Sequence, residues 1–185
     1  MIEPTQNLTT PELKFDDADI EALLERIERC VRDVSQGFER WGDPYARGPG
    51  LYIVVAGGSL TEFAAPMGSN RWPVEDCGTV FAETQTVLEA ARRVAFSHDG
   101  AIVVHSDGSI DEAMVRVDQC YPAGHRRTDD LPYAEWMGTR HMSALETSTR
   151  EEVIATITLS EEDGRVTVFT EGAFEDTQPT VPVTD

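Results

Sequence analysis

The most constraining feature of this chain is a run of consecutive apolar residues, Leu51–Ala56, which ends at Gly57-Gly58. A short apolar run that is stopped by glycines is typical of a buried strand. We therefore expect residues 51–56 to open the central sheet. The chain has 185 residues, of which 40% are hydrophobic, and this suffices for one domain with a substantial core.

The sequence before this strand predicts an amphipathic helix over residues 17–38. Its apolar residues recur at intervals of three and four, and acidic residues crowd the first turn, where the helix dipole favours them. These apolar positions are Ile20, Leu23, Leu24, Ile27, Val31, Val34 and Phe38. Residues 42–50 are rich in glycine and proline, which predicts a linker into the core.

The rest of the chain predicts two further helices and two hairpins. We expect the helices over residues 79–95 and 138–149. The hairpins are expected with strands 101–105 and 110–117, and with strands 153–159 and 165–170. Asp107-Gly108 favours the positive backbone angles of a tight turn in the first hairpin. The fold class is therefore α/β (α+β), with a mixed central β-sheet flanked by helices and an N-terminal amphipathic helix.

The two ends of the chain differ in composition from the single domain expected over residues 14–174. Residues 1–13 are polar and rich in threonine and proline, and residues 175–185 are acidic and contain two prolines. Such segments bury too little apolar surface to fold, so we expect both to be disordered tails. The polar residues 121–132 are expected to form a loop.

The charge balance of the chain constrains its partners and its environment. The formal net charge is -19, from 34 acidic and 15 basic residues, and Lys14 is the only lysine. A strongly acidic, lysine-poor surface suits a protein that works in concentrated salt, where repulsion between like charges is screened. We expect a haloarchaeal cytoplasm, with an ordinary acidic bacterial protein as the alternative. No basic stripe offsets the acidic surface, so a nucleic-acid partner is not expected.

Targeting signals and cysteine patterns point to the same compartment. The N-terminus lacks the charged and apolar regions of a signal peptide, and no apolar run is long enough to cross a bilayer. We therefore expect a cytoplasmic protein without a membrane partner. Cys30, Cys77 and Cys120 are odd in number and widely spaced, which indicates neither a disulfide framework nor a zinc site.

Two groups of residues in the second half suit the chemistry of joining nucleotides. Asp99 can activate a hydroxyl or hold a metal ion, and Gly100 removes the side chain where a backbone would approach a ligand. Arg140 carries a permanent charge and a planar fork of donors for phosphate oxygens, and His141 can donate further bonds. If Thr139 begins a helix, its hydroxyl and the free amides of the first turn add to the same anion site.

The order and the residues of three motifs resemble those of the diadenylate cyclase family. They are Asp99-Gly100-Ala101, Gly138-Thr139-Arg140-His141 and Ser160-Glu161-Glu162, which match the family's Asp-Gly-Ala turn, its Gly-Thr-Arg-His-Arg run and its Ser-Glu-Glu turn. The resemblance covers roughly residues 51–174 and is densest from Phe96 onward. One departure is Met142, which stands where the family usually has a second arginine.

The resemblance implies a function and a set of roles. Two ATP molecules would be condensed to cyclic di-AMP and two pyrophosphates by two protomers whose active sites face each other in a homo-oligomer. Asp99 would be catalytic, and a Mg²⁺ or Mn²⁺ ion would be held by Asp99, His98 and Glu162. The ATP-binding residues would be Gly100, Ala101, Thr139, Arg140, His141, Ser160 and Glu161.

Each motif also has a structural interpretation. Asp-Gly is a common turn element, an Arg-His pair can be a solvated helix start, and Ser-Glu-Glu can cap an exposed hairpin. His98 can be a partly buried neighbour of the turn instead of a metal ligand. Two other functions stay open on the sequence alone: a non-catalytic sensor that binds ATP or the cyclic dinucleotide, which Met142 favours, and an interaction module without a nucleotide.

Overall fold

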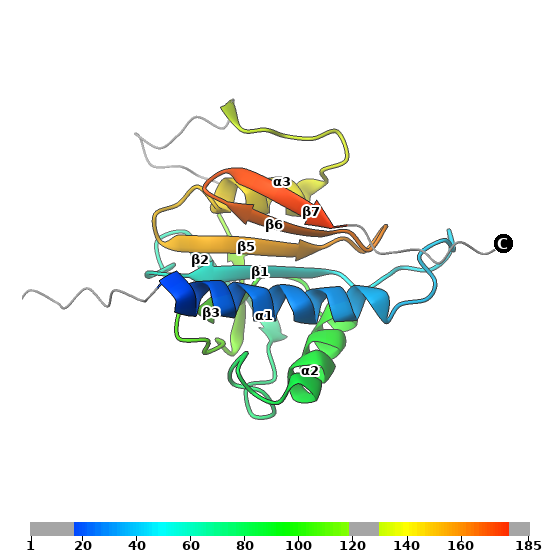
Figure 1. Cartoon of the computed structure of the whole chain (residues 1–185), viewed down its shortest axis with the longest axis horizontal. Coiled ribbons are helices and arrows are strands. Elements are labelled where there is room, and N and C mark those ends of the chain that lie inside the picture. The colour runs from blue at the N-terminus through cyan, green and yellow to red at the C-terminus, as the bar shows by residue number, and fades with distance from the viewer. Residues whose placement is uncertain (1–16, 119–129, 178–185) are drawn as a thin grey trace, which may run out of the picture.

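The computed structural model describes residues 17–118 and 130–177. Its elements in chain order are α1 (Asp17–Gln36), β1 (Leu51–Ala56), β2 (Ala64–Arg71), α2 (Thr84–Ser97), β3 (Ile102–His105), β4 (Ala113–Val117), α3 (Thr139–Thr147), β5 (Val153–Leu159), β6 (Val166–Thr170) and β7 (Ala173–Thr177). Figure 1 shows these elements along the chain. None of the described helices is long and apolar enough to span a membrane.

The centre of the structure is a five-stranded mixed sheet with the strand order β3-β1-β5-β6-β7. β1 pairs in parallel with β3 and antiparallel with β5, and the pairs β5–β6 and β6–β7 are antiparallel. All six residues of β1 are buried. The prediction of a buried strand over residues 51–56 is therefore confirmed, and so is the predicted fold class.

Helices cover both faces of this sheet, which explains why β1 is apolar at every position (Figure 1). Ile53 and Val55 belong to the core formed with α1 and α2. Tyr52 and Val54 belong to the core on the opposite face, where Leu145 of α3 packs. Side chains alternate between the two faces of a strand, so a strand with a core on each side needs no polar position.

The first predicted hairpin is present only in part. The bridges between Val104 and Ile110 and between Ala101 and Val115 are antiparallel, as a hairpin requires. However, β3 joins the central sheet, whereas β4 pairs with β2 in a separate two-stranded sheet. β2 was not predicted, because its sequence, AAPMGSNR, contains proline and glycine and lacks the β-branched residues that are typical of strands.

The other predicted elements differ from the structure mainly at their ends. α1 ends two residues before the predicted boundary, and α2 begins at Thr84 because Thr79 and Val80 pair with the 105–110 turn instead. The predicted hairpin over residues 153–170 is formed by β5 and β6. β7 runs to Thr177, so residues 175–177 extend the sheet and are not part of a tail. Residues 1–13, 178–185 and most of the predicted loop 121–132 lie outside the described residues.

The packing of α3 against the sheet predicts a clear stability effect. Leu145 is fully buried, and Leu145→Ala would leave a cavity between α3 and the strands. We expect the free energy of unfolding to fall by about 3 kcal/mol. Urea unfolding measures this loss. Met142 on the same helix is 36% exposed, so Met142→Ala is the control and should cost less than about 1 kcal/mol. Equal losses in the two variants would contradict this packing.

Candidate nucleotide-binding site

A cavity of about 230 Å³ lies where the segment before β1 meets the end of α2, the start of α3 and the turn after β5. Ten residues line it: Arg47, Gly48, Gly50, Ala95, Phe96, Ser97, His98, Asp99, Arg140 and Glu161. Sheet register explains the location. Leu51 at the start of β1 pairs with Leu159 at the end of β5, so the chain before β1 and the chain after β5 lie side by side.

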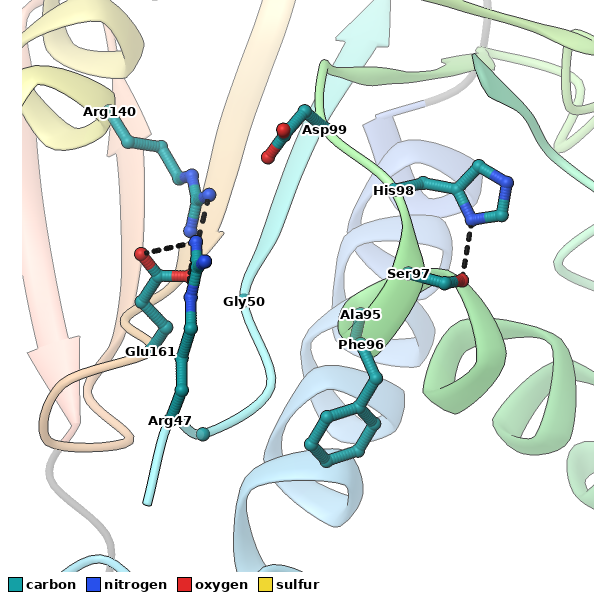
Figure 2. Close-up of a pocket in the computed structure, with 10 residues that line it drawn as sticks. Arg47, Gly50, Ala95, Phe96, Ser97, His98, Asp99, Arg140 and Glu161 are labelled. Carbon is teal, nitrogen blue, oxygen red and sulfur yellow. Dashed lines mark hydrogen bonds and ion pairs between the residues drawn. The ribbon is translucent and has the colours of Figure 1, made fainter. Parts of the chain in front are cut away.

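Asp99 and Arg140, which are 41 positions apart in the sequence, line this same cavity. Figure 2 shows the Asp99 carboxylate and the Arg140 guanidinium pointing into the space between their two walls. Asp99 follows the C-terminal end of α2 and is exposed. Its carboxylate makes no hydrogen bond or ion pair with any residue that the structure describes, although Asn70 Nδ2 donates a 2.8 Å hydrogen bond to its backbone carbonyl. The carboxylate is therefore available to a ligand.

Gly100 and Ala101 serve the turn that carries Asp99. Gly100 has φ +103, and a Cβ there would lie 3.0 Å from the carbonyl oxygen of Val115. Glycine is thus required by the backbone itself. Ala101 is buried and exchanges backbone hydrogen bonds with Val115. Direct contacts of Gly100 and Ala101 with a nucleotide stay a prediction, because neither residue lines this cavity.

The carboxylate of Glu161 lies between two arginines. It accepts hydrogen bonds from Arg47 Nε at 2.9 Å and from Arg47 Nη2 at 3.1 Å. Arg140 Nη2 lies 4.0 Å from its Oε2 atom. The bond to Glu161 raises the pKa of Arg47, and the negative charge of Asp99 raises it further. Two guanidinium groups therefore converge on one oxygen at the wall opposite Asp99, as Figure 2 shows.

The segment predicted as a linker forms one wall of this cavity. Gly48, Pro49 and Gly50 are all buried, and a Cβ on Gly50 would lie 2.5 Å from Arg140 Nη1. The glycine therefore makes room for the guanidinium. Arg47 was not predicted as a site residue, because nothing local distinguishes an arginine in a glycine- and proline-rich stretch. One signal could have indicated Arg47: the stretch that contains it leads directly into a buried strand, and the chain at the end of such a strand often lines a site.

A second cavity of about 610 Å³ adjoins the first, and Arg140 and Glu161 line both. Thr139, His141, Ser160 and Glu162 also line it, together with Glu135, Trp136, Gly138 and Asp163. The predicted ATP-binding residues of the second and third motifs are thus brought together. Arg140 stands between the two cavities, where it could contact a polyphosphate that extends from one into the other.

Thr139 and Ser160 have defined local positions in this second cavity. Gly138 is the N-cap of α3 and Thr139 its first residue, so no side chain caps the first amides of the helix. Uncapped amides at a helix start can bind an anion. Ser160 is buried, and its hydroxyl accepts hydrogen bonds from the backbone amides of Glu162 and Asp163 at 3.3 and 3.4 Å. It therefore also caps the turn, as the structural interpretation expected.

His141 follows Arg140 in the sequence but does not add a second positive charge to the site. The imidazole is buried, and burial together with the charge of Arg140 lowers its pKa from 6.5 to about 4. The ring is therefore neutral at neutral pH. It packs edge to face against Trp136 with ring centroids 5.1 Å apart, and its buried Nε2 atom has no hydrogen-bond partner among the described residues. A neutral imidazole can offer a phosphate a hydrogen bond but no positive charge, and the Nε2 atom of His141 is closed to solvent in this structure.

The three predicted metal ligands do not form a cluster. No group of three or more histidine, cysteine, aspartate or glutamate side chains is suitably placed in residues 17–118 and 130–177. His98 Nδ1 shares a 2.6 Å hydrogen bond with Ser97 Oγ, and Figure 2 shows its ring directed away from the Asp99 carboxylate. Glu162 lines the second cavity and not the first. Asp99 and His98 both line the first cavity, but only the Asp99 side chain points into it in Figure 2.

Comparison with known proteins identifies the class to which this fold and site belong. Residues 80–174, about half of the chain, match the DAC family, described as the nucleotide-binding domain of the bacterial checkpoint controller DisA. The chain therefore belongs to the DAC family of nucleotide-binding domains. This confirms the family resemblance drawn from the three motifs. A search of curated proteins finds no match.

Two solved structures are similar to this chain at low sequence identity. A hypothetical membrane spanning protein from Bacillus cereus is 18% identical over 86% of this chain and 68% of its own, with a TM-score of 0.55. DacA from Staphylococcus aureus, as a double mutant, is 20% identical over 86% of this chain and 89% of its own, with a TM-score of 0.48. The similarity to the Bacillus cereus protein supports the fold described above.

The low pKa of His141 predicts a stability that depends on pH. Between pH 6.5 and about pH 4, His141 is protonated in the unfolded chain but not in the folded protein. The free energy of unfolding should therefore decrease as the pH falls through this window, by about 2 kcal/mol for this residue. His141→Gln lacks this titration. Its free energy of unfolding, measured in urea at several pH values, should fall less steeply than that of the wild type.

The exposed His105 provides the control for this measurement. Its side chain is 41% exposed and pairs with Asp111 at the surface. His105→Gln leaves His141 in place, so its free energy of unfolding should fall between pH 6.5 and about pH 4 as steeply as that of the wild type. If the free energy of unfolding of His141→Gln fell as steeply with falling pH as that of the wild type, the lowered pKa of His141 would be contradicted.

Proposed function

We propose that this protein is a diadenylate cyclase that condenses two ATP molecules into cyclic di-AMP and two pyrophosphates. The observation that carries this proposal is the convergence of Asp99 and Arg140 on one cavity. A carboxylate that no described residue pairs with can accept a proton from a hydroxyl, and a guanidinium can bind phosphate oxygens, which are two roles that this reaction needs. Membership of a nucleotide-binding family supports the choice of substrate.

In the proposed reaction the 3′-oxygen of one ATP attacks the α-phosphorus of the other. A new phosphorus–oxygen bond forms, the bond to the β-phosphate oxygen breaks, and pyrophosphate leaves. Asp99 accepts the proton of the attacking hydroxyl, while Arg140 binds the phosphate oxygens as negative charge develops on them. The same step with the two roles exchanged closes the ring.

The family implies a divalent metal ion, and the first cavity offers one part of a site for it. Mg²⁺ is usually held by one or two carboxylates together with waters and substrate phosphates, so a three-residue cluster is not required. The exposed Asp99 carboxylate, which no described residue pairs with, fits this role. Glu162 faces the neighbouring cavity and could add a contact there. When bound, Mg²⁺ or Mn²⁺ would neutralise charge on the triphosphate.

A single protomer presents one set of the three motifs, so the proposed reaction needs two. The Asp99 carboxylate is exposed, so it is accessible from outside the protomer. Facing protomers would align the two nucleotides, and association would offset the entropy lost in that alignment. The proposed enzyme is therefore active as a face-to-face dimer, and its specific activity should rise with protein concentration.

Asp99→Asn tests the catalytic role directly. The amide cannot accept the hydroxyl proton, so we expect no detectable cyclic di-AMP, while the affinity for ATP stays within about tenfold of the wild type. Product and pyrophosphate are measured by chromatography after incubation with ATP and Mn²⁺ in high salt. Wild-type turnover by this variant would refute the role of Asp99.

Asp107→Asn is the matched control for this variant. Asp107 also precedes a glycine in a turn, but it lies outside both cavities and is hydrogen bonded to Ser109. Its substitution should leave product formation within about twofold of the wild type. A comparable loss of product formation in both variants would indicate that the substitutions act by destabilising the fold and not by removing a catalytic group.

A non-catalytic sensor of ATP or the cyclic dinucleotide is the second candidate. Met142 supports it, because this residue lines neither cavity and supplies no charge where the family usually has arginine. The same assay separates the two functions. Product formation supports the enzyme, whereas tight ATP binding without product supports the sensor. Neither binding nor product would favour an interaction module.

We also propose that the protein works in concentrated salt, in a haloarchaeal cytoplasm. The net charge of -19 on 185 residues destabilises the compact state through repulsion, and salt screens this repulsion.

The melting temperature should therefore rise by at least about 5 °C between low and molar KCl. Circular dichroism during heating measures it. The exposed residues Glu21 and Glu25 provide a test, since replacing both with lysine should flatten the salt dependence. A melting temperature that is independent of KCl would contradict this proposal.

A further inference from the structure

We propose that Arg47 is a second phosphate-binding residue of this site, supplied by the segment between α1 and β1. The inference rests on the proposed function for its natural ligand, the triphosphate of ATP. Arg47 lines the first cavity together with Asp99 and Arg140. The motifs that define the family site do not include this residue, and it lies before residues 80–174, which match the family.

The contacts of Glu161 show that Arg47 and Arg140 can serve one anion. Both guanidinium groups approach the same carboxylate oxygen, Oε2 of Glu161, at 2.8 Å from Arg47 and 4.0 Å from Arg140. A phosphate group offers more oxygens and more negative charge than a carboxylate, and arginine binds it with the same planar fork. A polyphosphate in the cavity can therefore replace Glu161 as the partner of both arginines.

The backbone that carries Arg47 is held firmly against the site. The Gly48 amide donates a 3.0 Å hydrogen bond to the carbonyl of Glu161, and the Gly50 amide donates one of the same length to Ala95. In contrast, the side chain of Arg47 is 75% exposed. A fixed backbone with an exposed side chain allows the guanidinium to turn from Glu161 toward a ligand at little cost.

Among the described residues, the charges that line the cavity balance only when a second cation is present. Its lining includes two carboxylates, Asp99 and Glu161, and two arginines, Arg47 and Arg140. Without Arg47, one guanidinium would face two carboxylates in a protein of net charge -19, and a polyanion would be repelled. Met142 does not line this cavity and cannot compensate. Arg47 thus gives the cavity a balanced charge before a metal ion or ligand binds.

Arg47→Gln tests this role with two probes, ATP and inorganic tripolyphosphate. Both dissociation constants are measured by calorimetry at one fixed KCl concentration. We expect the variant to bind each probe about tenfold more weakly, because one charge-assisted contact to phosphate is lost. Arg47→Lys keeps the charge and should recover part of the affinity. The exposed ion pair contributes little to folding, so the melting temperature should stay near that of the wild type.

Arg40→Gln is the matched control. Arg40 lies in the same segment and pairs with Asp43 at the surface, but it lines neither cavity. Its loss should change neither dissociation constant by more than about twofold. If Arg40→Gln weakens binding as much as Arg47→Gln, the segment acts through its conformation and the inference is overturned.

The outcomes separate this inference from the proposed function. Wild-type affinity of Arg47→Gln for both probes would overturn the inference, even if the wild type forms cyclic di-AMP. If the wild type binds tripolyphosphate through Arg47 but forms no product from ATP, the inference stands and the proposed catalysis fails. If the wild type binds neither probe, both are overturned.

Discussion

The antiparallel pairing of β1 with β5 is the interaction on which the candidate site depends. It places Leu51 opposite Leu159, so that the chain entering β1 runs beside the chain leaving β5. The hydrogen bond from the Gly48 amide to the Glu161 carbonyl extends this proximity beyond the strands. Residues 114 positions apart, Arg47 and Glu161, thereby form a bidentate ion pair. The register of the sheet thus sets one wall of the cavity.

Glu161 explains how the arginines can stay close together without a ligand. Two guanidinium groups beside one another repel, and a carboxylate between them offsets that repulsion. The side chains of Arg47 and Glu161 are 75% and 31% exposed, so water screens their attraction and the pair is not locked. A ligand with several negative oxygens can therefore compete for the same donors. The site is organised before binding yet remains open to exchange.

Sequence reasoning succeeded where the signal is local and failed where tertiary contacts decide. The apolar run at residues 51–56 and the alternation over residues 153–170 identified strands, because burial of these residues follows from their own pattern. The residues Asp99 and Arg140 were identified because their chemistry suits nucleotides and because they lie in three ordered motifs that resemble one family, and the structure brings them to one cavity. β2, the neutral state of His141 and the position of Arg47 depend on neighbours distant in sequence, which no local pattern encodes.

The N-terminal helix connects the two walls of the cavity and so bears on its width. Along its length α1 packs in the core that it shares with α2, whose C-terminal end leads to Asp99. At its own C-terminal end, Ser35 Oγ donates a buried 2.6 Å hydrogen bond to the carbonyl of Gly164, in the turn that carries Glu161. A shift of α1 relative to the sheet would therefore move one wall against the other. The proposed reaction needs Asp99 and the arginines to be held within a fraction of an ångström of their reactive positions, so we infer that α1 is a structural part of the site.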